Sequence, residues 1–154
     1  MQPLLERLMT TFPDAVRGVE VDTARNEITA RVAAARIVDV ARWLHDTPEA
    51  SFDHITDICS VDYPNDPERF EVVYQLLSLA HRRRIRLKAR VTEDAPQIAS
   101  VTGIWKGAEF MEREVYDLMG ITFVGHPDLR RILLPEDYEE GHPLRKDFPT
   151  EGRG

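Results

Sequence analysis

Residues 84–91 alternate strictly between basic and apolar side chains, and this pattern constrains the fold more than any other part of the chain. The basic and apolar positions are, in turn, Arg84, Arg86, Lys88 and Arg90, and Ile85, Leu87, Ala89 and Val91. Successive side chains of a β-strand point to opposite faces, so the segment is expected to be a strand with one apolar and one basic face. Such a strand requires a sheet that buries one of its two faces.

Four further segments have the composition of strands: residues 15–21, 27–33, 52–61 and 70–79. Polar residues separate the first two, and a proline-containing turn at residues 63–67 separates the last two. Because several of these strands follow one another without an intervening helix, the sequence predicts an α+β fold. We expect a mostly antiparallel sheet with a few packed helices and an extended C-terminal tail.

Three segments show the apolar spacing that is typical of helices. Residues 4–9 form the first, which ends at Pro13, and residues 37–44 form the second. A third helix is expected after Pro96, and Gly120 is a natural stop for it. The apolar face of this third helix is predicted to consist of Ala108, Met111, Val115 and Leu118.

Composition excludes several functional classes. The chain has 154 residues, which fits one core, and its single cysteine, Cys59, rules out an intramolecular disulfide. One thiol is also too few for a cysteine-ligated iron–sulfur cluster, which needs about four ligands. The net charge of −7 has the wrong sign for a general nucleic-acid binder. No apolar run approaches the ~18 residues of a membrane span, and the N-terminus lacks a signal or transit pattern, so a soluble intracellular protein is expected.

Residues 126–154 lose the regularity of the preceding chain, because four of the ten prolines fall there: Pro127, Pro135, Pro143 and Pro149. Leucines stand beside arginines in this segment, and an extended chain cannot bury its own leucines. It must pack back on its own domain or lie along another protein. Arginine beside large apolar residues is typical of interface anchors, so the composition favours a partner. We therefore expect an α+β domain, residues 1–125, and an extended partner-binding tail, residues 126–154.

The second half of the chain resembles a known family. The resemblance is carried by Glu112-Arg113-Glu114, Asp117, Gly120-Ile121 and Phe123, followed by HPDLRRILLPEDY from His126 and GHPLRKDFP from Gly141. Weaker matches upstream are Val61-Asp62-Tyr63-Pro64, Arg69-Phe70, Tyr74 and RIRLKARV. These motifs are similar to those of one subunit family of NADH–quinone oxidoreductase, the small hydrophilic subunit in the peripheral arm of respiratory complex I.

The resemblance implies a structural and assembly role in a proton-translocating complex. It implies that the C-terminal segment binds the large neighbouring subunit near the quinone site, here called the quinone-side subunit, on the cytoplasmic side of a bacterial membrane. NADH, FMN, iron–sulfur clusters and quinone are then expected in partner subunits, with no cofactor, metal or catalytic residue in this chain. The residues expected to contact a partner are Glu112, Arg113, Glu114, Asp117, His126, Asp128, Leu129, Arg130, Arg131, Ile132, Leu133, Arg145, Lys146, Asp147 and Phe148.

Two alternative functions remain open from the sequence. One is the homologous small subunit of a membrane-bound [NiFe] hydrogenase or of a complex linked to F420 or ferredoxin. The other, from a different class, is a free-standing metallohydrolase that would use His126 and His142, although their spacing fits no standard zinc pattern.

Three local features have a plain structural interpretation that we favour over a functional one. The carboxylates around Arg113 are expected to form ion pairs on a helix surface rather than an acid–base pair. The basic face of residues 84–91 is expected to be solvated or to meet acidic neighbours rather than nucleic acid, since no stacking aromatics are interleaved. Cys59 is expected to be a small buried hydrophobe rather than a nucleophile.

Overall fold

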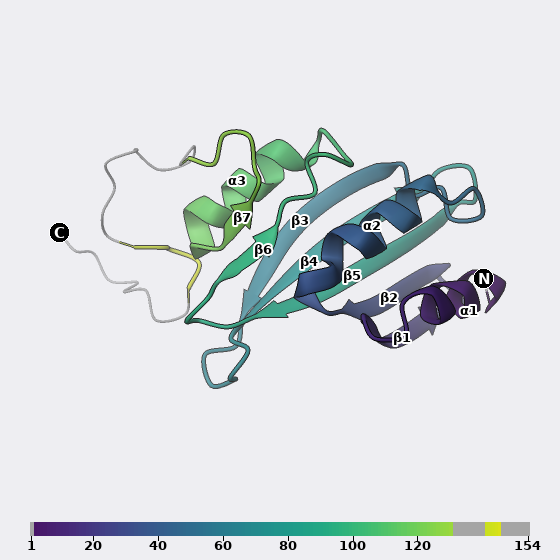
Figure 1. The fold of residues 1–154 in the computed structure, drawn as a ribbon, viewed down its shortest axis with the longest axis horizontal. Helices are drawn as coiled ribbons and strands as arrows, with labels where there is room; N and C mark the ends of the chain where they lie inside the picture. The colour runs from purple at the N-terminus through teal and green to yellow at the C-terminus, as the bar shows by residue number, and fades with distance from the viewer. Residues whose placement is uncertain (1, 131–140, 146–154) are drawn as a thin grey trace.

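The computed structural model describes residues 2–130 and 141–145, whose elements are shown in Figure 1. Their bounds are α1 Gln2–Thr11, β1 Val16–Asp22, β2 Glu27–Val32, the 3-10 turn η1 Ala34–Arg36, α2 Ile37–Asp46, β3 His54–Asp62, β4 Phe70–Ser78, β5 Arg83–Val91, β6 Gln97–Ala99, α3 Ala108–Met119 and β7 Thr122–Val124. The α+β fold expected from the sequence is confirmed.

The main sheet has five strands in the order β1-β2-β5-β4-β3. Neighbouring strands are antiparallel except β2 and β5, which run parallel. This single parallel pair follows from the chain path, because η1 and α2 carry the chain across the sheet to β3. The β3–β4–β5 meander then brings β5 back beside β2. Parallel strands require such a crossover, and this one contains a helix.

The two faces of β5 confirm the alternation that the sequence shows. Its apolar residues are buried against those of β4, and Leu87 lies directly opposite Tyr74. The basic side chains on the other face meet carboxylates of neighbouring strands and turns. Arg86 Nη2 lies 2.9 Å from Glu27 Oε1, and Arg90 Nη2 lies 3.3 Å from Asp66 Oδ2. The basic face is therefore placed among acidic neighbours.

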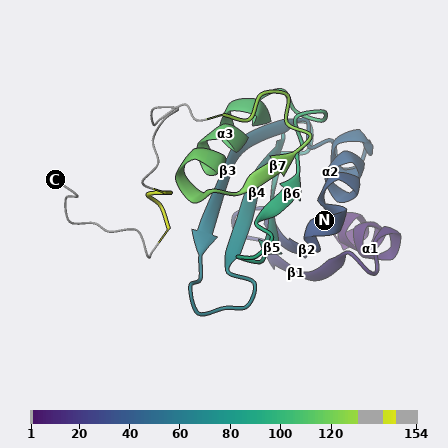
Figure 2. The same cartoon turned by 60° about the vertical axis from the view of Figure 1, so that its left-hand side comes forward.

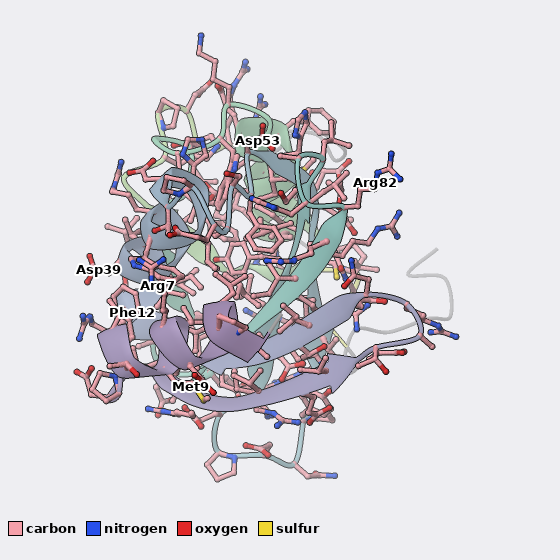
Figure 3. The ribbon with its side chains drawn as sticks, turned by 90° about the vertical axis from the view of Figure 1, so that its right-hand side faces the viewer. Arg7, Met9, Phe12, Asp39, Asp53 and Arg82 are labelled. Carbon is pink, nitrogen blue, oxygen red and sulfur yellow. The ribbon has the colours of Figure 1, made fainter. Side chains whose placement is uncertain are left out.

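Helices α1 and α2 lie on the same side of the sheet, over its apolar face (Figures 1 and 2). Figure 3 shows Arg7, Phe12 and Asp39 gathered where α1 meets α2, with Met9 pointing away from them. The Arg7 guanidinium lies 5.7 Å from the centre of the Trp43 ring, and Phe12 meets the same ring edge-on. Cation–π and edge-to-face contacts of this kind join the two helices.

The third helix begins later than Pro96 suggests. The chain first forms β6, which pairs in parallel with β7 to make a separate two-stranded sheet, and α3 starts only at Ala108. Each of these strands has three residues, which is too short to produce a readable alternation. The predicted end of the helix is confirmed, since Gly120 follows α3 with a left-handed φ of 76°.

Helix α3 packs mainly on β3, at one edge of the main sheet (Figure 2). Its buried face includes Ala108, Glu112, Val115 and Met119. Met111 and Leu118, which the spacing predicted to be core residues, are only half-buried. The prediction was wrong because it treated Glu112 as a surface residue. Among the residues described, no helix is long and apolar enough to cross a membrane.

Candidate functional site

The C-terminal end of α3 is closed by a segment from much later in the chain, residues 141–145. The last carbonyl groups of a helix have no partners within it. Here Leu144 N donates to Leu118 O at 2.9 Å, and Arg145 Nε donates to Met119 O at 2.7 Å. His142 Nδ1 donates to the carbonyl of Asp117 at 3.1 Å. We call this cap of α3 by residues 141–145 the anchor.

Gly120 makes the anchor sterically possible. A Cβ atom at this position would lie 2.6 Å from His142 Cδ2 and 2.7 Å from Arg145 Nη2, closer than such atoms approach in proteins. The positive φ of Gly120 also favours glycine over residues with a side chain. The glycine therefore both ends α3 and leaves room for the side chains that cap it.

The anchor is attached to the main sheet through Phe70. The Arg145 guanidinium carbon lies 4.8 Å from the centre of the buried Phe70 ring, and that of Arg69 lies 5.1 Å from it. Arg69 in turn forms a bidentate pair with Asp62, with N–O distances of 2.7 and 2.9 Å, and a third bond of 2.9 Å to Glu93. Since Asp62 and Arg69 are both almost fully buried, this pair fixes the β3–β4 turn beside the anchor.

Glu112 is an interior structural residue. Its Oε1 accepts a hydrogen bond from Ser100 Oγ at 2.6 Å, and its Oε2 accepts one from Val101 N at 2.8 Å. Burial raises the pKa of this carboxyl group despite these two bonds. The expectation of a surface ion pair with Arg113 is wrong for Glu112, because its oxygens serve the loop that leads into α3. Nearby, the pKa of the buried Tyr74 is also raised, first by desolvation and then by Glu112.

Asp117 is likewise fully buried, so neither it nor Glu112 presents a side chain to a partner in this structure. Arg113 and Glu114 are half-buried on the outside of α3. Arg113 Nε donates to the carbonyl of Arg130 at 3.4 Å, which brings the start of the expected tail alongside this helix.

His126 uses both of its ring nitrogens within the chain. Its Nε2 lies 2.8 Å from the carbonyl of Glu109, and its Nδ1 accepts a bond of 2.9 Å from Asp128 N. The ring is therefore the neutral tautomer with a proton on Nε2. Neither nitrogen is left with a free lone pair, and within residues 2–130 and 141–145 no group of three metal-ligating side chains is present. The arrangement favours hydrogen bonding over the metal site of the metallohydrolase alternative.

The remaining predicted contact residues divide into two sets. Leu129 packs against the core of the domain, while Asp128 and Arg130 are exposed and pair with each other at 3.0 Å. Six predicted residues lie outside the part of the chain that the structure describes: Arg131, Ile132, Leu133, Lys146, Asp147 and Phe148. Arg145, expected to contact a partner, instead donates to the chain's own Met119.

Known proteins share both the sequence and the fold of this chain. Residues 30–154 match the family described as "Respiratory-chain NADH dehydrogenase, 30 Kd subunit". The chain belongs to this family. It is 51% identical over 146 residues to the NADH-quinone oxidoreductase subunit of this family from Roseiflexus sp. strain RS-1, covering 95% of this chain and 82% of that protein. Its identity to the corresponding subunit of Xanthobacter autotrophicus is 50% over 152 residues, covering 99% of this chain and 71% of that protein. The predicted resemblance is confirmed.

Two solved structures place the fold in the same family. A trypsin-resistant fragment of Nqo5, residues 1–134, is 31% identical with a TM-score of 0.68, covering 83% of this chain and 98% of that fragment. A chain of the membrane-bound sulfane sulfur reductase, an archaeal respiratory membrane complex, is 27% identical with a TM-score of 0.83. That match covers 97% of this chain and 86% of the archaeal one.

The structure brings together family motifs that lie far apart in the sequence. Asp62 and Arg69, which carry the weaker upstream resemblance, meet Arg145 of the strong C-terminal motif around Phe70. The sequence indicates only a turn at Asp62, so the pairing with Arg69 seven residues later is missed. The presence of an acid and an arginine at the two ends of one hairpin is the signal that could have indicated it. Cys59 is exposed, so the prediction of a buried thiol was wrong.

Proposed function

We propose that this chain is a structural and assembly subunit of a proton-translocating NADH–quinone oxidoreductase and that it performs no redox step itself. In this proposal the α+β domain is a rigid platform. Residues beyond the anchor bind the large quinone-side subunit, and the assembled chain lies at the cytoplasmic side of the membrane through its partners.

The observation that carries the proposal is the anchor. Three bonds from residues 142–145 to α3, together with the stacking of Arg145 on Phe70, fix the point and direction from which residues 146–154 continue. A segment held at one end loses less entropy when it binds, because its starting position is already set. The basic and apolar side chains of Lys146 and Phe148 suit an interface with an acidic and apolar surface.

Composition supports the proposal that the cofactors reside in partner subunits. The single cysteine cannot supply the roughly four ligands of an iron–sulfur cluster, and the sequence contains neither a dinucleotide-binding glycine motif nor a phosphate-binding loop. We therefore assign NADH, FMN, iron–sulfur clusters and quinone to neighbouring subunits.

The alternative of a hydrogenase-like or ferredoxin-linked complex draws on the archaeal match. The fold of this chain also occurs in a sulfane sulfur reductase complex, so fold alone does not identify the electron donor. The identity of 51% to an NADH-quinone oxidoreductase subunit, against 27% to the archaeal chain, favours the NADH-linked complex.

Affinity purification of the full-length chain from native membranes, followed by mass spectrometry, tests the proposed function. We expect the quinone-side subunit and other peripheral-arm subunits of NADH–quinone oxidoreductase to co-purify in equal amounts with the chain. Recovery of the chain alone, or with the subunits of a hydrogenase, would refute the proposal.

A further inference from the structure

A small groove lies between β3 and α3, next to the anchor but outside it. Its lining consists of Asp57, Ile58, Cys59 and Ser60 from β3, Glu114, Val115, Leu118 and Met119 from α3, and Leu144. The groove has a volume of about 160 Å³. Small-molecule sites usually enclose about 300–1,000 Å³, so this groove suits a few side chains of a protein segment better than a metabolite.

The β3 lining shows that the groove opens at the edge of the sheet. Asp57, Ile58, Cys59 and Ser60 are consecutive, and consecutive side chains of a strand point to opposite faces. A groove that touches all of them must therefore lie along the edge rather than over one face. β3 is the last strand of the main sheet and, among the described strands, pairs with β4 alone. An edge strand offers backbone groups to which an extended segment can bind.

The side chains around the groove define the chemistry of its occupant. Val115, Met119 and Ile58 form a buried apolar floor, whereas Leu144 at the rim is 57% exposed. Asp57 and Glu114 add two carboxylates. Within the part of the chain that the structure describes, neither of them forms an ion pair or hydrogen bond. Two unpaired acids beside an apolar floor are complementary to a segment that carries a basic side chain next to apolar ones.

We propose that this groove binds an extended segment of a neighbouring protein of the complex, with a lysine or arginine placed between Asp57 and Glu114 and apolar side chains against Leu118 and Leu144. The inference rests on the proposed function. Leu144 lines the groove, and the chain leaves the anchor one residue later, at Arg145. A partner bound by residues 146–154 therefore reaches the groove without a further change in position.

Cys59 provides a native probe, because it is the only cysteine, is exposed and lines the groove. Partial burial and the nearby Asp57 raise the pKa of its thiol, so alkylation is best measured at about pH 8.5 and scaled to the urea-unfolded chain. We expect N-ethylmaleimide to modify Cys59 readily in the isolated full-length chain and at least tenfold more slowly in the purified complex. A matched control carries Cys59→Ser with Asp94→Cys, which places the thiol on an exposed loop, and it should show at least tenfold less protection than Cys59.

Three results would overturn the proposal. Equal alkylation rates in the isolated chain and in the complex would show that no partner covers the groove. Strong protection that is already present in the isolated chain at all concentrations would show that the chain covers its own groove. Protection of the isolated chain that increases with its concentration would identify a second copy as the occupant. All three are measured with a complex in hand, whereas failure to obtain any complex would refute the proposed function.

Charge reversal tests the predicted chemistry of the occupant. The double variant Asp57→Lys with Glu114→Lys should reduce recovery of the assembled complex at least fivefold, since two cations would face the partner's basic side chain. Asp94→Lys, which changes the net charge at an exposed loop site, should leave recovery unchanged. Normal recovery of the folded double variant would contradict the inference.

Discussion

Arg145 takes part in both interactions that hold the anchor to the domain. Its Nε caps Met119 at the end of α3, and its guanidinium lies over Phe70 of β4. Lysine cannot replace it, since a point charge on a flexible stem lacks the planar group that stacks on a ring while donating sideways. The anchor is therefore sensitive to a single side chain.

Arg145→Ala should lower the free energy of unfolding by about 1–2 kcal/mol, because it removes one charge-assisted hydrogen bond and one cation–π contact. Urea denaturation measures this loss. Leu144→Ala is the matched control, since Leu144 bonds to α3 only through its backbone and its side chain is exposed. An equal loss in the two variants would show that the Arg145 side chain is unimportant for the anchor.

Glu112 should make stability depend on pH in a direction that is unusual for a carboxylate. Burial raises its pKa in the folded chain above the ordinary value of 4.5. As pH rises through this window, the unfolded chain loses its proton before the folded chain does, so the free energy of unfolding falls. Glu112→Gln removes this titration while keeping a side chain that can bond to Ser100 and Val101. Its unfolding free energy, measured by denaturation from about pH 4 upward, should decline less than that of the wild type; identical pH slopes would contradict the assignment.

At the scale of elements, the spacing of apolar residues predicted every strand of the main sheet and all three helices, because each is long enough to repeat its pattern. Periodicity could not reveal β6 and β7, which have three residues each. It also misjudged the face of α3, since a buried glutamate contributes nothing to an apolar pattern. The parallel pairing of β2 with β5 depends on how the chain crosses the sheet, and no local pattern encodes that.

The division of the chain at residues 125 and 126 needs the same elemental view. Residues 141–145 pack on α3, so part of the expected tail contributes to the domain. A chain that ends at Arg145 should unfold with the same free energy as the full-length chain, within about 0.5 kcal/mol. A chain that ends at Gly125 should lose about 2–4 kcal/mol, because three carbonyl groups of α3 lose their donors. Chemical denaturation of the two truncated chains checks this difference; equal stabilities would show that the anchor does not stabilise the domain.

At the scale of the whole molecule, the family and the general role were easier to predict from the sequence than the site. The C-terminal motifs identified the family by resemblance, and the comparisons confirm it. The anchor could not be predicted, because it joins Asp62, Arg69, Gly120 and Arg145 across turns whose geometry the sequence does not specify. Side chains assigned to a partner, such as Glu112 and Arg145, bind within the chain instead.

The most direct test of the account is quantitative capture of the quinone-side subunit by the full-length chain and by the chain that ends at Arg145. Both keep the anchor, so both should be equally stable, and any difference in capture reports on residues 146–154 alone. We predict that the shortened chain captures less than about a tenth as much of this partner as the full-length chain, a loss of at least ~1.4 kcal/mol in binding. Equal capture by the two chains would contradict the claim that this segment binds the partner.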